Sequence, residues 1–312
     1  MSTVVSGVAG SVVDGLVVVD KPSGWTSHDV VGRMRRLCRT RKVGHGGTLD
    51  PMATGVLIIG VGKATKLLGR ITASDKSYTA TIRLGVSTLT DDAEGEVLTV
   101  ASVAGLADER ARIDEQVAAL TGPILQRPSS VSAIKVDGKR SYARVRSGET
   151  VRLEPRPVTV SEFEVLSVVS TVAQDREVLD LDVRVTVSSG TYVRALARDL
   201  GEALGTGGHL TALRRTRVGP FTLAQASTLE QLENDLQVLT LAEVCSELFA
   251  SVVVGGEDAR VVGHGGRLAW PAELAEPDVA ETVAIFTTDG QVLALAECRE
   301  CQLAPVVVWA SG

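Results

Sequence analysis

The sequence predicts an α+β fold, in which a large domain on a mixed sheet precedes a small β-rich domain. Segments with the alternation of strands are interleaved irregularly with helical segments, which favours a mixed sheet. Beyond about residue 250, short valine-rich runs are separated by glycines. The 312 residues also exceed what one core usually supports. Two domains are therefore expected.

The first elements follow from local signals. An apolar run over residues 15–19 predicts a strand, and the turn residues Pro22 and Gly24 close it. A helix is expected to begin at Thr26, because Thr26 and Asp29 have the spacing of a capping box. Residues 44–47 are rich in glycine and predict a loop. Residues 1–14 are expected to be a flexible N-terminus.

Later segments complete the predicted large domain, residues 15–228. Strands are expected over 56–61, 79–84 and 178–187, with helices near 108–120 and from 188–190 through 204. A leucine- and glutamate-rich segment, 229–249, predicts a helical linker. Residues 250–312 form the predicted small domain, with short strands over 251–254, 283–286 and 306–309.

Charge divides the chain in the same place. Residues 230–312 hold 14 acidic and 3 basic side chains, a net charge of −11, whereas residues 1–229 hold 24 and 29, a net charge of +5. Such a charge asymmetry, with a basic part joined to an acidic part, often indicates a protein that binds nucleic acid. No apolar run approaches the roughly 20 residues of a membrane span.

The segment 44–57, GHGGTLDPMATGVL, is the leading candidate for chemistry. Glycines let the backbone approach a ligand, and Pro51 favours an extended Asp50 whose carboxylate projects from the loop. By itself, such an aspartate is more often a turn former than a catalyst. The four histidines are scattered, and Cys298 and Cys301 form a lone C-x-x-C, so a metal site is not expected.

Six segments together resemble the TruB family of tRNA pseudouridine-55 synthases. The segment 44–57 is similar to the family pattern GHTGTLDPxATGxL, and residues 20–27 are similar to DKPxGxTS. The other four are DKSY at 75–78, PSSVSAIK at 128–135, GTYVR at 190–194 and HLTALRR at 209–215. They occur in the family's order across roughly residues 15–220. Gly46 departs from the pattern, which has threonine there.

The resemblance implies a pseudouridine synthase catalytic domain followed by a small PUA-like domain. It implies that Asp50 is the catalytic aspartate and that His45 fills the gap left by the extruded base. Tyr78 would stack on the target uracil, and Arg194 would pair with Asp50. Tyr192 and Leu213 would line the uridine pocket.

Basic residues near these segments predict contacts with RNA phosphates. One group leads into the Asp50 loop and the other accompanies the pocket residues. The candidates are Arg33, Arg35, Arg36, Arg39, Arg41 and Lys42 in the first group, and Arg214 and Arg215 in the second.

The resemblance implies isomerisation of uridine 55 in the tRNA T-arm, by base flipping and C1′–N1 cleavage. We expect a stand-alone cytoplasmic monomer that needs neither cofactor nor metal, nor an obligate protein partner, and that binds no membrane. Three alternatives stay open: a guide-RNA-dependent synthase resembling dyskerin, a uracil-releasing glycosylase, and an RNA-folding module. Whether Asp50 attacks C1′, adds to C6 or abstracts a sugar proton also stays open.

Overall fold

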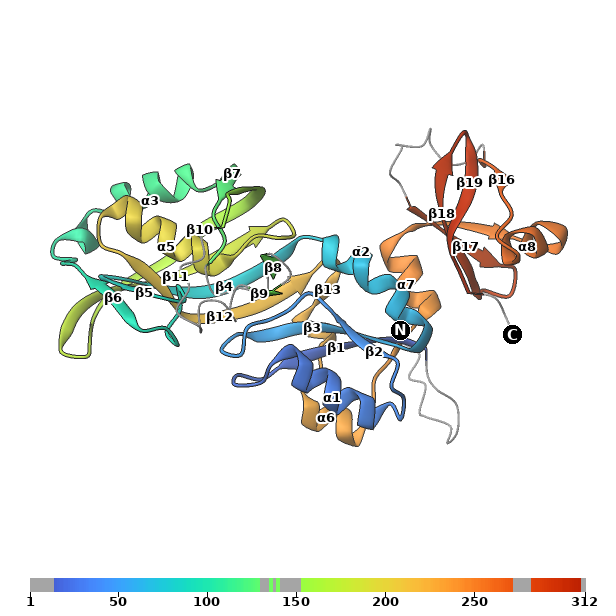
Figure 1. Ribbon diagram of the computed structural model, residues 1–312, viewed down its shortest axis with the longest axis horizontal. Coiled ribbons are helices and arrows are strands. Elements are labelled where there is room, and N and C mark those ends of the chain that lie inside the picture. The colour runs from blue at the N-terminus through green and yellow to red at the C-terminus, as the bar shows by residue number, and fades with distance from the viewer. Residues whose placement is uncertain (1–13, 130–134, 137–138, 141–152, 272–281, 310–312) are drawn as a thin grey trace.

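The computed structural model describes residues 14–129, 135–136, 139–140, 153–271 and 282–309. Its main feature is a ten-stranded sheet with the strand order β14-β1-β3-β12-β4-β11-β10-β7, to which β2 adds on β3 and β13 on β12 (Figure 1). Strand β12 runs parallel to β3 and antiparallel to β4, so the sheet is mixed. The predicted α+β class is confirmed. The strands are β1 (Gly15–Lys21), β2 (Val43–Gly46), β3 (Thr54–Val61), β4 (Lys76–Leu84), β7 (Gly122–Gln126), β10 (Arg156–Ala173), β11 (Arg176–Val187), β12 (Gly208–Val218), β13 (Phe221–Thr222) and β14 (Leu239–Thr240).

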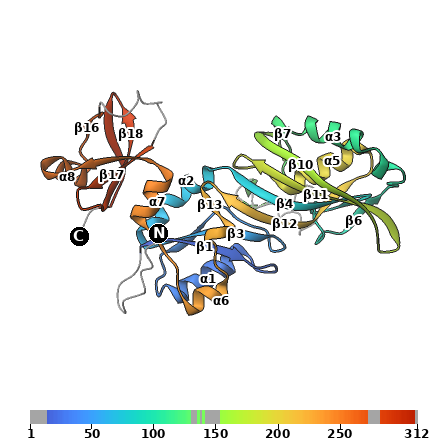
Figure 2. The same cartoon turned by 180° about the vertical axis from the view of Figure 1, so that it is seen from behind.

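Helices cover this sheet at both of its ends (Figures 1 and 2). Helix α1 begins after Thr26, whose side chain and that of Asp29 form the predicted capping box. Helix α5 packs closely on the backbone that leads into β12: a Cβ at Gly201 would lie only 2.2 Å from the carbonyl carbon of Gly207, so glycine is needed there. The helices are α1 (Ser27–Leu37), η1 (Gly62–Leu67), α2 (Leu68–Ala73), η2 (Leu106–Asp108), α3 (Arg110–Ala119), α5 (Val193–Leu204), η3 (Leu223–Gln225), α6 (Leu229–Asn234) and α7 (Leu241–Leu248).

The predicted glycine-rich loop at 44–47 is wrong for its first three residues, which belong to strand β2. Strand β2 pairs with β3, with Gly44 opposite Gly60. A Cβ at Gly44 or Gly60 would lie 3.0 or 3.1 Å from side-chain atoms of Leu68 on α2. The glycines therefore let α2 pack directly on the two strands.

Residues 229–249 also differ from the expected helical segment. They form two short helices, α6 and α7, and between them β14 pairs with β1 at the edge of the large sheet. The predicted flexible N-terminus and most of segment 128–135 lie outside the described residues. No helix in the described ranges has the length and apolar composition needed to cross a membrane.

The C-terminal residues form a second sheet, in the order β15-β17-β18-β19-β16. It shares a core with the large sheet, since Phe286 and Trp309 pack in one buried cluster with Leu16 and Ile58. Arg70 of α2 reaches across to Glu297, with Nη2 3.0 Å from the carboxylate oxygen. The elements are β15 (Ala250–Val254), α8 (Gly256–Gly263), β16 (Leu268–Ala269), β17 (Thr282–Thr287), β18 (Val292–Arg299) and β19 (Gln302–Val308).

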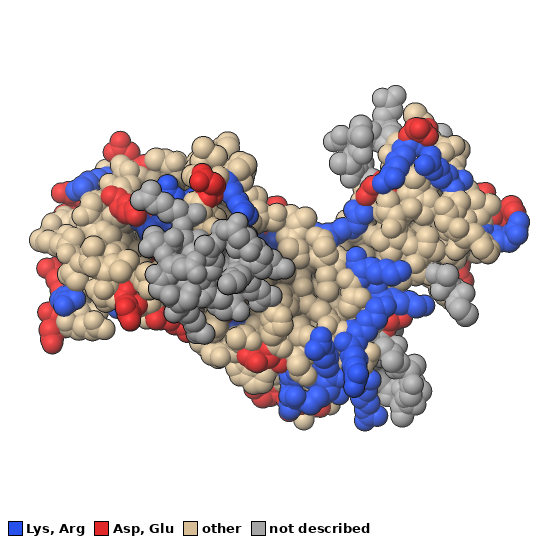
Figure 3. All heavy atoms as spheres, viewed as in Figure 1, with Lys and Arg blue, Asp and Glu red and all other residues tan. Residues whose placement is uncertain are grey.

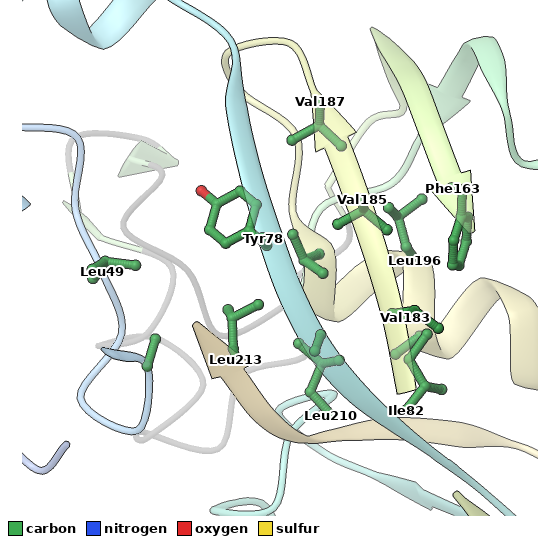
Figure 4. Packing of buried hydrophobic residues seen from close by; sticks show 14 of the residues in the cluster. Leu49, Tyr78, Ile82, Phe163, Val183, Val185, Val187, Leu196, Leu210 and Leu213 are labelled. Carbon is green, nitrogen blue, oxygen red and sulfur yellow. The ribbon is translucent and has the colours of Figure 1, made fainter. Parts of the chain in front are cut away.

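Two small hairpins lie outside both sheets, β5 (Val86–Thr88) with β6 (Val97–Val100), and β8 (Lys135–Val136) with β9 (Lys139–Arg140). The main core lies between the large sheet and its helices. Alternate residues of β4 and β11 point into it, as Ile82 and Val183 do in Figure 4. At one end of this core, Tyr78 and Leu213 project toward the loop that carries Leu49 (Figure 4). The core thus ends where the candidate site begins.

Candidate active site

A cavity of about 520 Å³ lies where this core meets the loop that follows β2. Residues of α2, β4, β12 and the start of α5 complete its wall. Six of the sequence-predicted residues line it together: Asp50, Tyr78, Tyr192, Arg194, Leu213 and Arg215. His45 is not among its lining residues. Segments far apart in the sequence therefore bring one carboxylate, two tyrosines and two arginines to a single pocket.

Asp50 is held by Arg194 at two points. The Nε and Nη2 atoms of Arg194 lie 3.0 and 3.3 Å from the two carboxylate oxygens. Asp50 keeps 36% of its side chain exposed, whereas Arg194 keeps 6%. Such a two-point contact fixes the orientation of the carboxylate. Asp50 is thus fixed in position and open to the pocket.

Arg194 is itself held in place by Asp92, a residue that no sequence motif indicated. Its Nη1 donates to the buried carboxylate of Asp92 at 3.1 Å and to the carbonyl of Thr90 at 2.8 Å. Asp92 also accepts the backbone N–H of Glu94 at 3.1 Å. One arginine therefore joins an exposed and a buried carboxylate. The pair Asp91-Asp92 in a basic domain is the sole sequence signal for it.

A second missed residue, Gln126, holds the backbone of Tyr192. The side chain of Gln126 is buried, accepts the N–H of Tyr192 at 2.8 Å and donates to its carbonyl at 3.1 Å. Arg198 fastens the same region by bonding the carboxylate of Asp91 at 3.1 Å and the carbonyl of Arg127 at 2.7 Å. The start of α5 is thus a rigid wall of the pocket.

The loop carrying Asp50 is held by side chains on its other sides. The hydroxyl of Ser27 accepts the N–H of Leu49 at 2.9 Å and donates to its carbonyl at 3.1 Å. The fully buried Lys21 donates to the carbonyls of Trp25 and Pro51 at 2.8 and 3.2 Å. Burial lowers the pKa of Lys21 to about 8. These bonds tie residues 21–27 to the loop.

Arg215 does not fit the predicted phosphate contact. Only 1% of it is exposed, and it donates to the carbonyls of Val56 at 2.7 Å, Gly47 at 3.0 Å and Thr48 at 3.4 Å. Gly55 lets β3 lie against it, because a Cβ there would come within 2.1 Å of the Arg215 carbonyl oxygen. In this structure the guanidinium anchors the loop instead.

The other predicted phosphate contacts lie outside the pocket. Arg214 pairs with Asp20 at 2.7 Å, and Arg33 pairs with Glu233. The remaining five are exposed and form no ion pair with any described residue: Arg35, Arg36, Arg39, Arg41 and Lys42. Figure 3 shows basic side chains gathered over the end of α1 and β2 and continuing toward α2. These five remain available to a ligand.

His45 lies on β2, beside the ring of His28. The two ring centroids are 5.5 Å apart, with the rings nearly perpendicular at 79°. Burial, and then the neighbouring His28, lower the pKa of His45. Its buried Nδ1 has no hydrogen-bond partner among the described residues. His45 is thus a largely neutral ring close to the Asp50 loop but outside the pocket.

The fold is that of a pseudouridine synthase, the class named by the family model that the chain matches. The structure titled a Cbf5–Nop10–Gar1 complex matches with a TM-score of 0.70 and 27% identity, over 96% of this chain and 84% of that chain. An H/ACA RNP bound to a substrate RNA matches with a TM-score of 0.67 and 26% identity, over 95% and 84%.

The chain belongs to the TruB family. The family model for the N-terminal domain of TruB family pseudouridylate synthases matches residues 35–193, and the model for the tRNA pseudouridylate synthase B C-terminal domain matches residues 194–250. A tRNA pseudouridine synthase B of Arthrobacter sp. is 57% identical, over 96% of this chain and 97% of its own length. That of Thermobifida fusca is 55% identical, over 96% and 99%.

Proposed function

We propose that this protein converts uridine 55 in the T-arm of tRNA to pseudouridine, with Asp50 as its catalytic carboxylate. The observation that carries the proposal is the Asp50–Arg194 pair in a pocket walled by Tyr78, Tyr192 and Leu213. The relatives named tRNA pseudouridine synthase B support tRNA as the substrate. They are about twice as similar in sequence as the Cbf5 structures, which favours an enzyme without a guide RNA.

The pocket suits the demands of this reaction. The C1′–N1 bond breaks, the freed uracil turns, and C5 bonds to C1′, with no net redox change and no hydrolysis. Asp50 supplies the carboxylate, while Tyr78 offers a flat face on which the extruded base can stack. Leu213 and Tyr192 would keep the freed base in place. His45, outside the pocket, would occupy the space that the base leaves in the RNA.

The deciding experiment uses an unmodified T-arm hairpin and full-length tRNA, with pseudouridine mapped after incubation. Wild-type protein should modify position 55 without guide RNA or added protein. Asp50→Asn should lower turnover at least about a thousandfold, roughly 4 kcal/mol of barrier, because no carboxylate remains to react. Its tRNA affinity should stay within a few-fold.

Asp114→Asn is the matched control. Asp114 is an exposed carboxylate on α3 that pairs with Arg110, outside the pocket, so turnover should be unchanged. Release of free uracil by the wild type would instead select a glycosylase. Retention of more than about one per cent activity by Asp50→Asn, a barrier change below about 3 kcal/mol, would remove Asp50 from its role.

A further inference from the structure

Three cationic side chains line the pocket, and they differ in how many of their N–H groups donate hydrogen bonds to the protein. Arg194 bonds two carboxylates and a carbonyl. Arg215 directs its Nε, Nη1 and Nη2 atoms at three carbonyls of the adjacent strand and loop. The third is Lys76, the first residue of β4. The sequence motifs predicted no role for it.

Two of the three N–H groups of Lys76 donate to described protein atoms, which leaves the third for a ligand. The ammonium nitrogen donates to the carbonyls of Thr72 at 2.8 Å and Ser74 at 2.6 Å, and an ammonium group has three N–H bonds. Only 7% of Lys76 is exposed, and it forms no ion pair with a described residue. A cation buried without a counter-ion is unfavourable unless a ligand supplies negative charge.

The position of Lys76 points to the base as that ligand. Lys76 and Tyr78 are two residues apart on β4, so their side chains leave the same face of the strand. A Cβ on Gly47 would lie 3.4 Å from Cε of Lys76 and 3.6 Å from Nη1 of Arg215. Both cations therefore lie next to Gly47, in the loop that carries Asp50.

Every route to pseudouridine makes the uracil ring negative. Attack of Asp50 on C1′ leaves the electron pair of the broken C1′–N1 bond on the ring. Removal of a sugar proton followed by elimination leaves the same pair there. Addition of Asp50 to C6 moves ring electrons onto O4. In each case at least one carbonyl oxygen of the ring carries part of the charge, and a nearby fixed donor to that oxygen lowers the barrier.

We propose that Lys76 is a further catalytic residue, whose third N–H donates to a carbonyl oxygen of the uracil as that oxygen becomes anionic. This inference rests on the proposed function. Arg215 contributes positive charge behind Lys76 while it anchors the loop. Asp50 and Lys76 thus have different roles: Asp50 is the reacting carboxylate, and Lys76 donates a hydrogen bond that stabilises the negative charge developing on the uracil.

A purely structural role for Lys76 is the competing explanation, because it bonds carbonyls at the C-terminal end of α2. Two variants separate the roles. Lys76→Gln keeps hydrogen-bond donors for those carbonyls but has no charge, whereas Lys76→Arg keeps both. Single-turnover rates with saturating tRNA should fall about a hundredfold or more in Lys76→Gln. Lys76→Arg should stay within about tenfold of wild type, since the charge remains.

A pH profile gives a readout that a structural role would not change. Burial, and then the charge of Arg215, lower the pKa of Lys76 to about 8, against an opposing effect of Asp75. The wild-type rate at low tRNA concentration should fall above about pH 8 as the ammonium loses its proton. In Lys76→Arg this fall should disappear, because arginine stays charged. Asp50, Arg194 and Arg215, the other charged groups lining the pocket, are the same in both proteins.

Each other outcome overturns the inference. If Lys76→Gln reacts at the wild-type rate, the lysine only caps α2. If Lys76→Gln binds tRNA weakly but reacts normally at saturation, the ammonium contacts a phosphate and not the base. Equal alkaline falls in wild type and Lys76→Arg would assign the titration to another group. Failure of wild-type protein to form pseudouridine would refute the proposed function instead.

Discussion

Basic side chains occupy two regions that look alike in the sequence and differ in the structure. The pocket group, Arg194 and Arg215, is buried, and each member bonds carboxylates or carbonyls of the protein. The outer group is exposed on α1 and on the connection between α1 and β2, and it forms no ion pair with a described residue; it consists of Arg35, Arg36, Arg39, Arg41 and Lys42. Proximity to the Asp50 loop therefore does not by itself leave a basic side chain free to contact a phosphate. Of the two groups, only the outer one is exposed enough to do so.

The difference predicts opposite consequences of substitution. Removing one partner of a buried ion pair leaves the other charge without compensation, which is strongly destabilising. An exposed charge contributes little to stability but much to the attraction of a phosphate backbone. The pocket group should thus control folding and turnover, and the outer group should control RNA binding and its salt dependence.

The largest effect is expected at Arg194. In Arg194→Met the buried Asp92 loses its cation and Asp50 loses its two-point contact, so unfolding free energy should fall by about 3–5 kcal/mol. Turnover should fall as well. Urea denaturation and single-turnover rates measure the two effects. Arg36→Met, an exposed substitution of the same kind, should change stability by no more than about 0.5 kcal/mol. Equal stability of the two variants would contradict the proposed division.

Arg215 should have the next largest effect. In Arg215→Lys the planar fork is lost, and one ammonium cannot reach the carbonyls of Gly47, Thr48 and Val56 together, so stability should fall by about 1–3 kcal/mol. Turnover should fall with it, because the loop loses its anchor. Arg214→Lys on the same strand is the control, since lysine can still pair with Asp20. Normal stability and turnover in Arg215→Lys would mean that the loop is held by Ser27 and Lys21 alone.

Sequence patterns were sufficient where the signal lies within one segment. Alternation predicted β4 and β11, and the capping box predicted the start of α1, each within about three residues. They were insufficient where the cause lies between segments. Strand β2 was missed because glycine is usually depleted in strands, and here it makes room for Leu68.

The candidate site shows the same limit. Asp50, Tyr78 and Arg194 lie in contiguous motifs, so sequence could single them out, although their roles remain proposals. Asp92 could not be found in this way, because it acts through Arg194, 102 residues away. Gln126 likewise acts on Tyr192, 66 residues away. The burial that separates Arg215 from the outer group arises only when β3 and β12 come together.

The outer group should affect binding without affecting folding. Replacing Arg35, Arg36, Arg39 and Arg41 together by glutamine should weaken tRNA binding. It should also flatten the slope of log affinity against log salt by up to about 0.7–0.9 per lost contact. Arg156→Gln with Arg176→Gln, exposed positions on β10 and β11, is the control and should leave the slope unchanged. An unchanged slope in the quadruple variant would exclude these residues as the phosphate contacts.

The smallest effect is expected at Arg70, which belongs to neither group. Arg70 lies on α2, and it pairs with Glu297 of the second sheet at 3.0 Å. The side chains of Arg70 and Glu297 are 32% and 28% exposed, so the pair should contribute well under about 1 kcal/mol. The hydrogen bond from Arg70 lowers the pKa of Glu297 below its ordinary value of 4.5.

The sign of the pH dependence follows from that direction. A carboxylate whose pKa is lower in the folded than in the unfolded protein stabilises the fold above the unfolded value of 4.5, and this contribution is lost as the pH falls through the folded value. The difference in unfolding free energy between wild type and Glu297→Gln should therefore be present at pH 6 and vanish in acid. Glu257→Gln, at a fully exposed pair on α8, should show a smaller difference at every pH. The opposite outcome is a difference in unfolding free energy, caused by Glu297→Gln, that persists unchanged below the pH at which Glu297 titrates. In that case the Arg70–Glu297 ion pair does not stabilise the contact between α2 and the second sheet, and Arg70 belongs with the outer group of residues available to bind RNA.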